Sequence, residues 1–245
     1  MSRRRFRVRE APEAGRASLD AETARHAVKV LRLAAGDAVV LFDGRGSEWE
    51  GVVERATKKG VLVRTGEAKA SPPAPGPRIV LGTAAPKGKR ATTLLAMATE
   101  AGADVLVPVL WSRSAVRGVG ASKAAHWGRA VEEAARQCGR AWMPALEGET
   151  DLAEFLARPA APGERRFLAS TAGDPPPLGL LLASGPAPAA ATILVGPEGG
   201  ATEEEEAAAR AAGFEPCSLG PHILRVETAA VAAVVIVVNY CNINT

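Results

Sequence analysis

Two glycine-rich loops near the end of the chain carry the residues best suited to binding a ligand. The first is Ile193-Leu-Val-Gly-Pro-Glu-Gly-Gly200, and the second is Leu219-Gly-Pro-His-Ile-Leu-Arg-Val-Glu-Thr-Ala229. Each lies between an apolar run and a helix-like run, and glycines without side chains let the backbone approach a ligand closely. Two such loops, close in sequence, predict two walls of one pocket.

The residues that follow the first loop narrow what it could bind. A Walker-type phosphate loop needs a lysine and then Ser or Thr, whereas Ala201-Thr202 and four glutamates follow here. Those glutamates would repel a triphosphate, and the dinucleotide spacing G-x-G-x-x-G is also absent. Taken alone, the segment 196–200 is equally well explained as an ordinary strand-to-helix turn. Its pairing with the second loop favours a ligand site.

Three polar residues, Arg225, Glu227 and Thr228, lie where the second loop meets the final apolar run. Helix capping with a local ion pair would account for these residue types. The functional interpretation is that Arg225 faces the pocket and Glu227 orients it, because a guanidinium paired with a carboxylate is held rigidly. The residues alone leave both interpretations open.

Charge is distributed unevenly along the chain. The formal net charge is +3, but residues 1–76 hold 15 Lys and Arg against 10 Asp and Glu, whereas residues 77–245 hold 15 against 17. The first part is therefore the candidate polyanion-binding part. Its basic clusters are Arg3, Arg5, Arg7 and Arg9 in alternation, Arg25, Lys29 and Arg32 at helical spacing, and Lys58-Lys59 on a turn.

For any one of these clusters a solvated surface is the commoner explanation. Three clusters within one small domain favour nucleic acid as the partner. Aromatic residues for base stacking are scarce there, with only Phe6, Phe42 and Trp49. Contacts to phosphates and to RNA shape are therefore expected in preference to stacking on single strands.

A proline-rich segment, residues 70–77, predicts a linker between two domains. Before it, short apolar runs with tight polar turns predict a small, mostly antiparallel β-barrel. There we expect a helix over 20–33 and strands over 38–42, 47–55 and 61–64.

After the linker, strand-like and helix-like runs alternate, which is typical of an α/β domain with a largely parallel sheet. We expect strands over 78–82, 104–109, 166–170 and 192–195, and helices over 89–101 and 122–138, the last with Trp127, Val131, Ala134 and Cys138 on its apolar stripe. Ligands of such sheets bind in loops beyond the strand carboxyl ends, and the loop 196–200 follows a strand in that way.

The end of the chain begins with a capping box, Thr202 to Glu205, and a helix stop at Gly213. The apolar run 229–238 has the β-branched content of a strand, but its length and the preceding Glu227-Thr228 favour a buried helix. The polar tail 239–245 fits neither structure.

Several classes of protein are disfavoured. The apolar run 229–238 is too short to span a membrane, and the basic start lacks the apolar stretch of a secretory signal. Three cysteines cannot form a disulfide framework, which suggests a reducing compartment. Neither they nor His26, His126 and His222 have metal-ligand spacing, so no metal is expected.

These motifs together resemble the ribosomal RNA small subunit methyltransferase E family, which belongs to the SPOUT class of methyltransferases. The two glycine-rich loops are the specific matches. The supporting matches are His26 to Arg32 with Leu41 to Gly44, Lys87 to Gly102, and Glu133 to Arg140 with Pro144. They follow the family's order over nearly the whole chain. A departure is Glu100-Ala-Gly102, where the family often has Glu-Leu-Gly.

The resemblance implies a PUA-like, RNA-binding barrel over 1–72 and a SPOUT methyltransferase domain over 77–245 with a C-terminal trefoil knot. It implies a cytoplasmic homodimer that binds S-adenosylmethionine and methylates N3 of a uridine in 16S rRNA of the small ribosomal subunit. The uridine N3 proton has to leave, so the site needs a base or a cation that stabilises the uridine anion. Arg225 is the candidate for the anion and Glu198 the candidate proton acceptor.

The resemblance also suggests which residues contact the ligands. The cofactor is expected at Leu194, Gly196, Glu198, Gly199, Gly200, Leu219, Gly220, Ile223, Leu224, Arg225 and Thr228. RNA is expected at Arg3, Arg5, Arg7, Arg9, Arg25, Lys29, Arg32, Lys87, Arg90 and Arg113.

Two other functions stay open. A non-catalytic RNA-binding or ribosome-assembly protein could keep the same fold, although it would be expected to have lost the glycine-rich loop. A nucleotide-hydrolysing enzyme would need a lysine-containing phosphate loop, which this sequence lacks.

Overall fold

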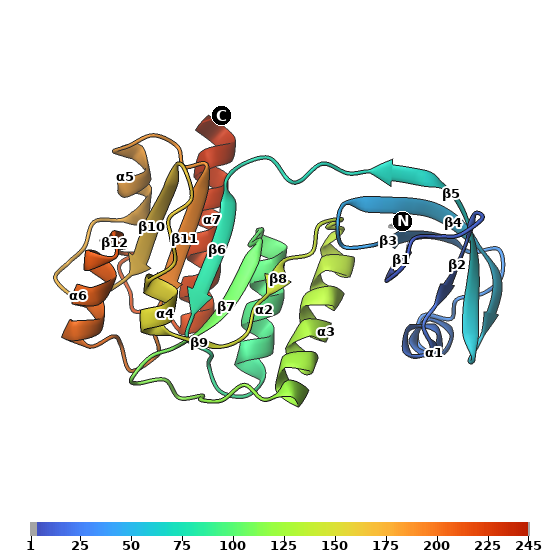
Figure 1. The fold of residues 1–245 in the computed structure, drawn as a ribbon, viewed down its shortest axis with the longest axis horizontal. Helices are drawn as coiled ribbons and strands as arrows, with labels where there is room; N and C mark the ends of the chain where they lie inside the picture. The colour runs from blue at the N-terminus through green and yellow to red at the C-terminus, as the bar shows by residue number, and fades with distance from the viewer. Residues whose placement is uncertain (1–3, 245) are drawn as a thin grey trace. The chain divides into compact units, whose positions relative to one another are not determined.

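The computed structural model describes residues 4–244 and divides into two compact units (Figure 1). One unit comprises Met1–Ala74 together with Ala135–Met143, and the other comprises Pro75–Ala134 with Pro144–Thr245. The division after Ala74 falls inside the proline-rich segment. The return of Ala135–Met143 to the first unit is a feature that the sequence did not predict.

The first unit is a five-stranded sheet with one helix. Its sheet has the order β1-β3-β4-β5-β2, with β1 parallel to β3 and every other pair antiparallel. The predicted antiparallel character is therefore confirmed. The elements are β1 (Arg4–Arg7), β2 (Arg16–Leu19), α1 (Ala21–Lys29), β3 (Ala38–Phe42), β4 (Ser47–Thr57) and β5 (Gly60–Ala70).

Helix α1 begins as predicted because the Asp20 carboxylate accepts hydrogen bonds from the backbone N–H groups of Glu22 and Thr23. It ends at Lys29, four residues earlier than predicted, and Arg32 has a left-handed backbone with φ of 52°. Apolar side chains from the strands and from α1 form one core, which includes Phe6, Ala24, Leu41, Trp49, Val53 and Val63.

The segment that returns to the first unit docks on the turn between β3 and β4. Its hydrogen bonds run from Gly46 N–H to the Ala141 carbonyl, at 3.2 Å, and from Met143 N–H to the Gly44 carbonyl, at 3.0 Å. The indole N–H of Trp142 donates to the Ser71 carbonyl at 2.7 Å. A Cβ on Gly46 would lie 2.4 Å from the Trp142 ring, so only glycine allows this approach.

The second unit is built on a parallel sheet with the order β12-β10-β11-β6-β7-β8. All five neighbouring pairs are parallel, and β9 extends the pairing of β7. The predicted parallel α/β architecture is confirmed. The strands are β6 (Arg78–Thr83), β7 (Val105–Leu110), β8 (Ala145–Leu146), β9 (Thr150–Asp151), β10 (Glu164–Ala169), β11 (Ala190–Val195) and β12 (Phe214–Cys217).

Helices cover both faces of this sheet (Figure 1). α7 packs on β6 and β11 and against α2 and α5, whereas α4 and α6 contact each other at the other face. There the core includes Trp111, Phe155, Leu168, Leu194 and Phe214. The helices are α2 (Lys89–Ala101), α3 (Ala121–Cys138), α4 (Leu152–Leu156), α5 (Leu178–Ala183), α6 (Glu203–Ala211) and α7 (Val226–Asn244).

Two helix predictions need correction. Trp127, Val131 and Ala134 of α3 are buried as predicted, but Cys138 is exposed, because the helix ends there. The polar tail is helical as far as Asn244, so α7 runs six residues beyond Val238. Cys241 is buried on its inner side, and the Asn239 side chain donates to the Val235 carbonyl at 3.0 Å.

α7 is long and apolar enough to cross a membrane by length and composition, over Val226–Ile243. Its buried residues, however, pack on the sheet and on α2, which is the environment of a core helix. We therefore interpret α7 as the buried helix that the apolar run 229–238 predicted.

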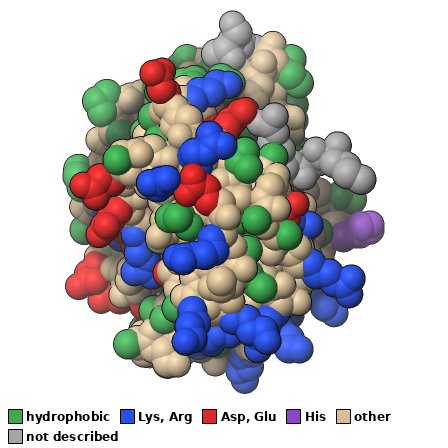
Figure 2. Space-filling model, turned by 90° about the vertical axis from the view of Figure 1, so that its right-hand side faces the viewer, with side chains coloured by type: hydrophobic (Ala, Val, Ile, Leu, Met, Phe, Trp, Pro, Cys, Tyr) green, Lys and Arg blue, Asp and Glu red, His purple; other side chains and the backbone are tan. Residues whose placement is uncertain are grey.

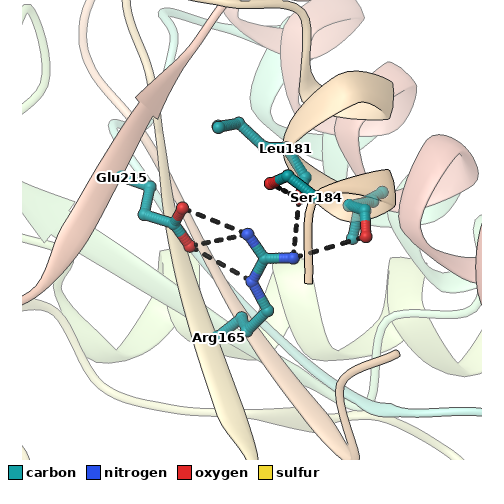
Figure 3. Close-up of polar contacts among 5 residues, drawn as sticks. Arg165, Leu181, Ser184 and Glu215 are labelled. Carbon is teal, nitrogen blue, oxygen red and sulfur yellow. Dashed lines mark hydrogen bonds and ion pairs between the residues drawn. The ribbon is translucent and has the colours of Figure 1, made fainter. Parts of the chain in front are cut away.

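At the amino end of the sheet, Arg165 joins three elements (Figure 3). Its guanidinium donates to both oxygens of Glu215 on β12, at 2.9 and 3.1 Å, and to the Leu181 carbonyl in α5, at 2.8 Å. A cation near the last carbonyls of a helix interacts favourably with the helix dipole. Arg165 therefore fixes α5 against the edge of the sheet.

A second, more buried ion pair on β10 joins Glu164 to Arg166. Their side chains are 7% and 11% exposed, and Nε of Arg166 lies 2.9 Å from Oε1 of Glu164. Burial alone would raise the pKa of Glu164. The hydrogen bonds from Ala161 N–H and Thr192, with the charge of Arg166, outweigh burial and hold the pKa of Glu164 below its usual value of 4.5.

This lowered pKa makes the stability of the second unit depend on acidity. The stabilisation from Glu164 is complete above the unfolded-state pKa near 4.5 and is lost as pH falls through the lower folded-state pKa. Glu164→Gln should lower the free energy of unfolding at pH 7 by about 1–3 kcal/mol, and this difference should shrink below about pH 4.5. Urea unfolding of both proteins at several pH values measures it. Exposed Glu100→Gln is the control, and a difference independent of pH would contradict the prediction.

Candidate functional site

Four strands of the second unit bring the segments that follow them to one edge of the sheet. The register pairs Ala169 with both Val195 and Cys217, and it pairs Val195 with Thr83. The carboxyl ends of β6, β10, β11 and β12 therefore lie at the same height in the sheet. Because these strands are parallel, the segments that follow them leave the same edge. Both glycine-rich loops predicted from the sequence, 196–200 and 219–225, are among these segments.

The first loop is a tight turn on the end of β11. Gly200 N–H donates to the Pro197 carbonyl at 2.9 Å, so Glu198 and Gly199 form the tip of the turn, and both are exposed. The predicted capping box follows: Thr202 accepts from Glu205 N–H, and the Glu205 carboxylate accepts from Thr202 N–H at 2.8 Å. The loop is therefore fixed at both ends while its tip faces outward.

The loop after β7 is fastened to the first loop from one side. Nη1 of Arg113 donates to the Gly199 carbonyl at 3.0 Å, and Glu205 accepts a hydrogen bond from Ser112 N–H at 2.7 Å. A Cβ on Gly199 would lie 3.3 Å from Cβ of Arg113, which leaves little room beside the turn.

The second loop runs beside the segment that follows β10. Ser218 N–H donates to the Pro176 carbonyl, and Leu178 N–H donates to the Ser218 carbonyl, both at 3.0 Å. Ile223 in this loop is 87% exposed. A Cβ on Gly220 would meet open space. The loop therefore offers an uncovered apolar surface and free backbone next to a sheet edge.

A three-residue ion cluster joins the first loop to two helices. Nη1 of Arg90, in α2, lies 2.9 Å from Oε1 of Glu198 and 3.8 Å from Oε2 of Glu227, in the first turn of α7. The cation beside Glu227 is therefore Arg90 rather than Arg225, and the expected pairing of Glu227 with Arg225 is wrong. Within residues 4–244 the exposed Arg225 makes no ion pair.

The structure brings most of the predicted cofactor residues to this edge, with one difference in role. Leu194 lies inside β11 with 0% exposure and packs in the core, so it supports the loop through its backbone. Gly196 is half-buried. A Cβ added at Gly196 would lie 3.9 Å from the Trp111 ring. The remaining members lie in the two loops or at the start of α7, and of these Leu219 and Leu224 are half-buried.

The predicted RNA-contacting residues are scattered, and several are engaged within the protein. Arg3 lies outside the described residues. Arg5 forms an ion pair with Glu48 at 2.6 Å and stacks its guanidinium over Phe42, and Arg7 is half-buried. The exposed basic residues among the predicted set are Arg9, Arg25, Lys29 and Arg32 in the first unit and Lys87 and Arg113 in the second.

Basic side chains gather over the lower part of one face of the molecule (Figure 2).

In the first unit, Trp49 is only 7% exposed and forms part of the core, and it lines an open groove of about 430 Å³. Its ring is therefore largely covered and offers little face for stacking bases, while contacts to phosphates and RNA shape stay a prediction.

Sequence reasoning missed two residues of the site. Trp111 is 1% exposed, and its indole N–H is buried without a hydrogen-bond partner among residues 4–244. Its place directly after β7 is the signal that could have identified it, because that position follows a parallel strand. The sequence suggests an RNA contact for Arg90. Its actual partners lie more than one hundred residues further along the chain, so no local spacing could have indicated them.

Comparison with known families agrees with this geometry. Residues 73–238 match an RNA methyltransferase domain, and residues 19–65 match an RNA methyltransferase PUA domain. The ribosomal RNA small subunit methyltransferase E of Synechocystis is 32% identical over 206 residues, covering 84% of this chain and 67% of that protein. The protein of the same name from Mycobacterium tuberculosis is 31% identical, covering 93% and 88%.

Two solved structures are similar over nearly their whole length. A putative methyltransferase from Legionella pneumophila, in complex with S-adenosylmethionine, has a TM-score of 0.87 at 28% identity, with 97% of each chain covered. A ribosomal RNA small subunit methyltransferase E from Neisseria gonorrhoeae, also bound to S-adenosylmethionine, has a TM-score of 0.85 at 29% identity, with 95% of each covered.

The predicted fold class, a SPOUT-type α/β domain preceded by a PUA-like domain, is confirmed by these likenesses. The sheet order does not test the knot, which stays a prediction. From the domain matches and the length of the shared alignment, this chain is an RNA methyltransferase and belongs to the ribosomal RNA small subunit methyltransferase E family.

Proposed function

We propose that this protein uses S-adenosylmethionine to methylate N3 of a uridine in the 16S rRNA of the small ribosomal subunit. The observation that carries the proposal is the convergence of both glycine-rich loops at one edge of the sheet. Two relatives with the same overall fold have S-adenosylmethionine bound. Family membership supports the rRNA substrate, and the sequence resemblance supports uridine N3.

The residues at this edge suit the cofactor chemically. The exposed apolar side chain of Ile223 and the half-buried Leu219 and Leu224 offer apolar surface for a purine ring, and the neighbouring backbone offers hydrogen-bond groups. The open space beside Gly220 leaves room for a ligand. When bound, the cofactor supplies a methyl group activated by a sulfonium ion. The loops would position it, and positioning two substrates supplies much of the rate of such a reaction.

Two side chains remain the candidates for handling the uridine. Arg225 is exposed and makes no ion pair within residues 4–244, so its guanidinium is free to stabilise a uridine anion. Glu198 is the proposed proton acceptor. Its Oε1 is engaged by Arg90, so its other oxygen would accept the N3 proton.

Gly199→Val should abolish cofactor binding without unfolding the protein, because a branched side chain would fill the space beside Arg113. Overpacking beside Arg113 costs the folded state about 1–3 kcal/mol, which is less than a typical free energy of folding, so the protein should stay folded. Calorimetric titration with S-adenosylmethionine measures the loss. The control is Gly148→Val, since a Cβ at Gly148 meets open space. Wild-type affinity in a folded Gly199→Val protein would reject this site.

Mass spectrometry of 16S rRNA tests the reaction itself. In a deletion strain, the wild-type gene should restore one N3-methyluridine, and the Gly199→Val gene should not. If the protein binds RNA but not S-adenosylmethionine, the non-catalytic RNA-binding or ribosome-assembly function is favoured instead.

We also propose that the first unit supplies RNA affinity through its exposed basic side chains. Replacing Arg25, Lys29 and Arg32 together by glutamine should weaken RNA binding and flatten its salt dependence, since each lost phosphate contact reduces the slope by about 0.7–0.9. Filter binding across a salt series measures this slope. The control triple replaces residues of the same unit that are already ion-paired: Arg4, Arg16 and Arg64. An unchanged slope would argue against the proposal.

A cytoplasmic homodimer is the proposed assembly. Along α7, Val235 is 38% and Ile243 is 81% exposed, so the helix keeps an uncovered apolar side. Light scattering at micromolar concentration should give about twice the chain mass of 25.3 kDa. Val235→Asp should move the mass toward one chain, whereas Val30→Asp in the first unit should not. A monomer that still methylates RNA would refute the dimer.

A further inference from the structure

Arg90 lies where three segments of the second unit converge. It is the second residue of α2, and its guanidinium contacts Glu198 in the turn after β11 and Glu227 in the first turn of α7. The side chains of Arg90, Glu198 and Glu227 are 39%, 35% and 14% exposed. One cation thus holds a carboxylate of the turn and a carboxylate of α7 together.

The two carboxylates depend on that cation. Oε2 of Glu227 is buried and has no hydrogen-bond partner among residues 4–244, so the charge of Arg90, 3.8 Å away, is its nearest compensation. Without Arg90, a largely buried carboxylate would lose its cation and would repel Glu198. Glu198 is the part of this pair that can move, because it lies at the exposed tip of the turn.

The turn is also held by a second, separate contact. The Gly199 carbonyl accepts a hydrogen bond from Arg113 at 3.0 Å. Adjacent residues of the turn are therefore held by two different arginines, Glu198 through its side chain and Gly199 through its backbone. Removing either contact would leave the tip free to rotate about the other.

We infer that Arg90 is a positioning residue for the cofactor and not a contact for RNA phosphates. It acts through Glu198 and Glu227, holding the turn 196–200 against the start of α7 in the conformation that receives S-adenosylmethionine. The inference rests on the proposed cofactor site. It replaces the RNA-binding role that the sequence suggested for Arg90, because a guanidinium shared by two carboxylates has little charge left to offer a phosphate.

The two roles predict opposite results for Arg90→Ala. A positioning role predicts that affinity for S-adenosylmethionine falls about tenfold, as expected for one partly exposed charged contact, whereas RNA affinity and its salt slope stay at wild-type values. A phosphate-binding role predicts unchanged cofactor affinity and a salt slope smaller by about 0.7–0.9. Calorimetry with S-adenosylmethionine and filter binding with 16S rRNA fragments measure both quantities.

Three further variants sharpen the test. Arg90→Lys keeps the charge but not the planar fork, so it should restore only part of the cofactor affinity. In a Glu198→Gln background, Arg90→Ala should cost less than in wild type, because the contact it removes is already weakened. Lys89→Ala, which removes a neighbouring exposed charge from α2, should change neither affinity.

The outcomes separate this inference from the proposed function. If the wild-type protein does not bind S-adenosylmethionine, the proposed function fails. If the wild type binds and folded Arg90→Ala binds equally well, the positioning role is overturned while the cofactor site stands. Should Arg90→Ala fail to fold, Arg90→Lys decides through cofactor affinity, since lysine keeps the charge that sets the RNA salt slope. Wild-type affinity for S-adenosylmethionine would then overturn the inference, and reduced affinity would support it.

Discussion

The level carboxyl ends of the parallel strands are the constraint on which the rest of the site depends. Thr83, Ala169, Val195 and Cys217 share one register, so segments separated by more than one hundred residues leave the sheet at one edge. No single segment there could form a pocket. The hydrogen bonds of the sheet fix the walls of the candidate site before any ligand arrives, which would lower the ordering cost of binding.

A site built from backbone turns needs its charges held in place. Three carboxylate groups at this edge are engaged: Glu205 with two backbone N–H groups, and Glu198 and Glu227 with Arg90. A cationic sulfonium is compatible with such surroundings, whereas a triphosphate is not. At the same edge, Arg225 is exposed and makes no ion pair within residues 4–244, which suits it to a substrate that becomes anionic.

Local signals in the sequence predicted local structure well. Helix α2 and strand β3 have the predicted bounds, and Thr202 with Glu205 forms the predicted capping box. These three features depend only on residues that are close together in the sequence. Strand β12 was missed because Phe214–Cys217 is four residues long with Pro216 inside it. The partner of Glu227 was assigned wrongly because proximity in sequence favoured Arg225, whereas only the packing of α2 beside α7 brings Arg90 there.

The first unit shows why a boundary drawn from sequence differs from a physical one. The proline-rich segment is a real break in composition, yet Ala135–Met143 lies with the first unit although it follows α3 in the chain. Its contacts are specific: two backbone hydrogen bonds to the turn at Gly44 and Gly46, and the Trp142 ring against a glycine that no larger residue could replace. A fragment that ends at the linker would lose these contacts and expose the turn that they cover. The two units are therefore joined by three crossings of the chain rather than one, and a single linker does not describe their connection.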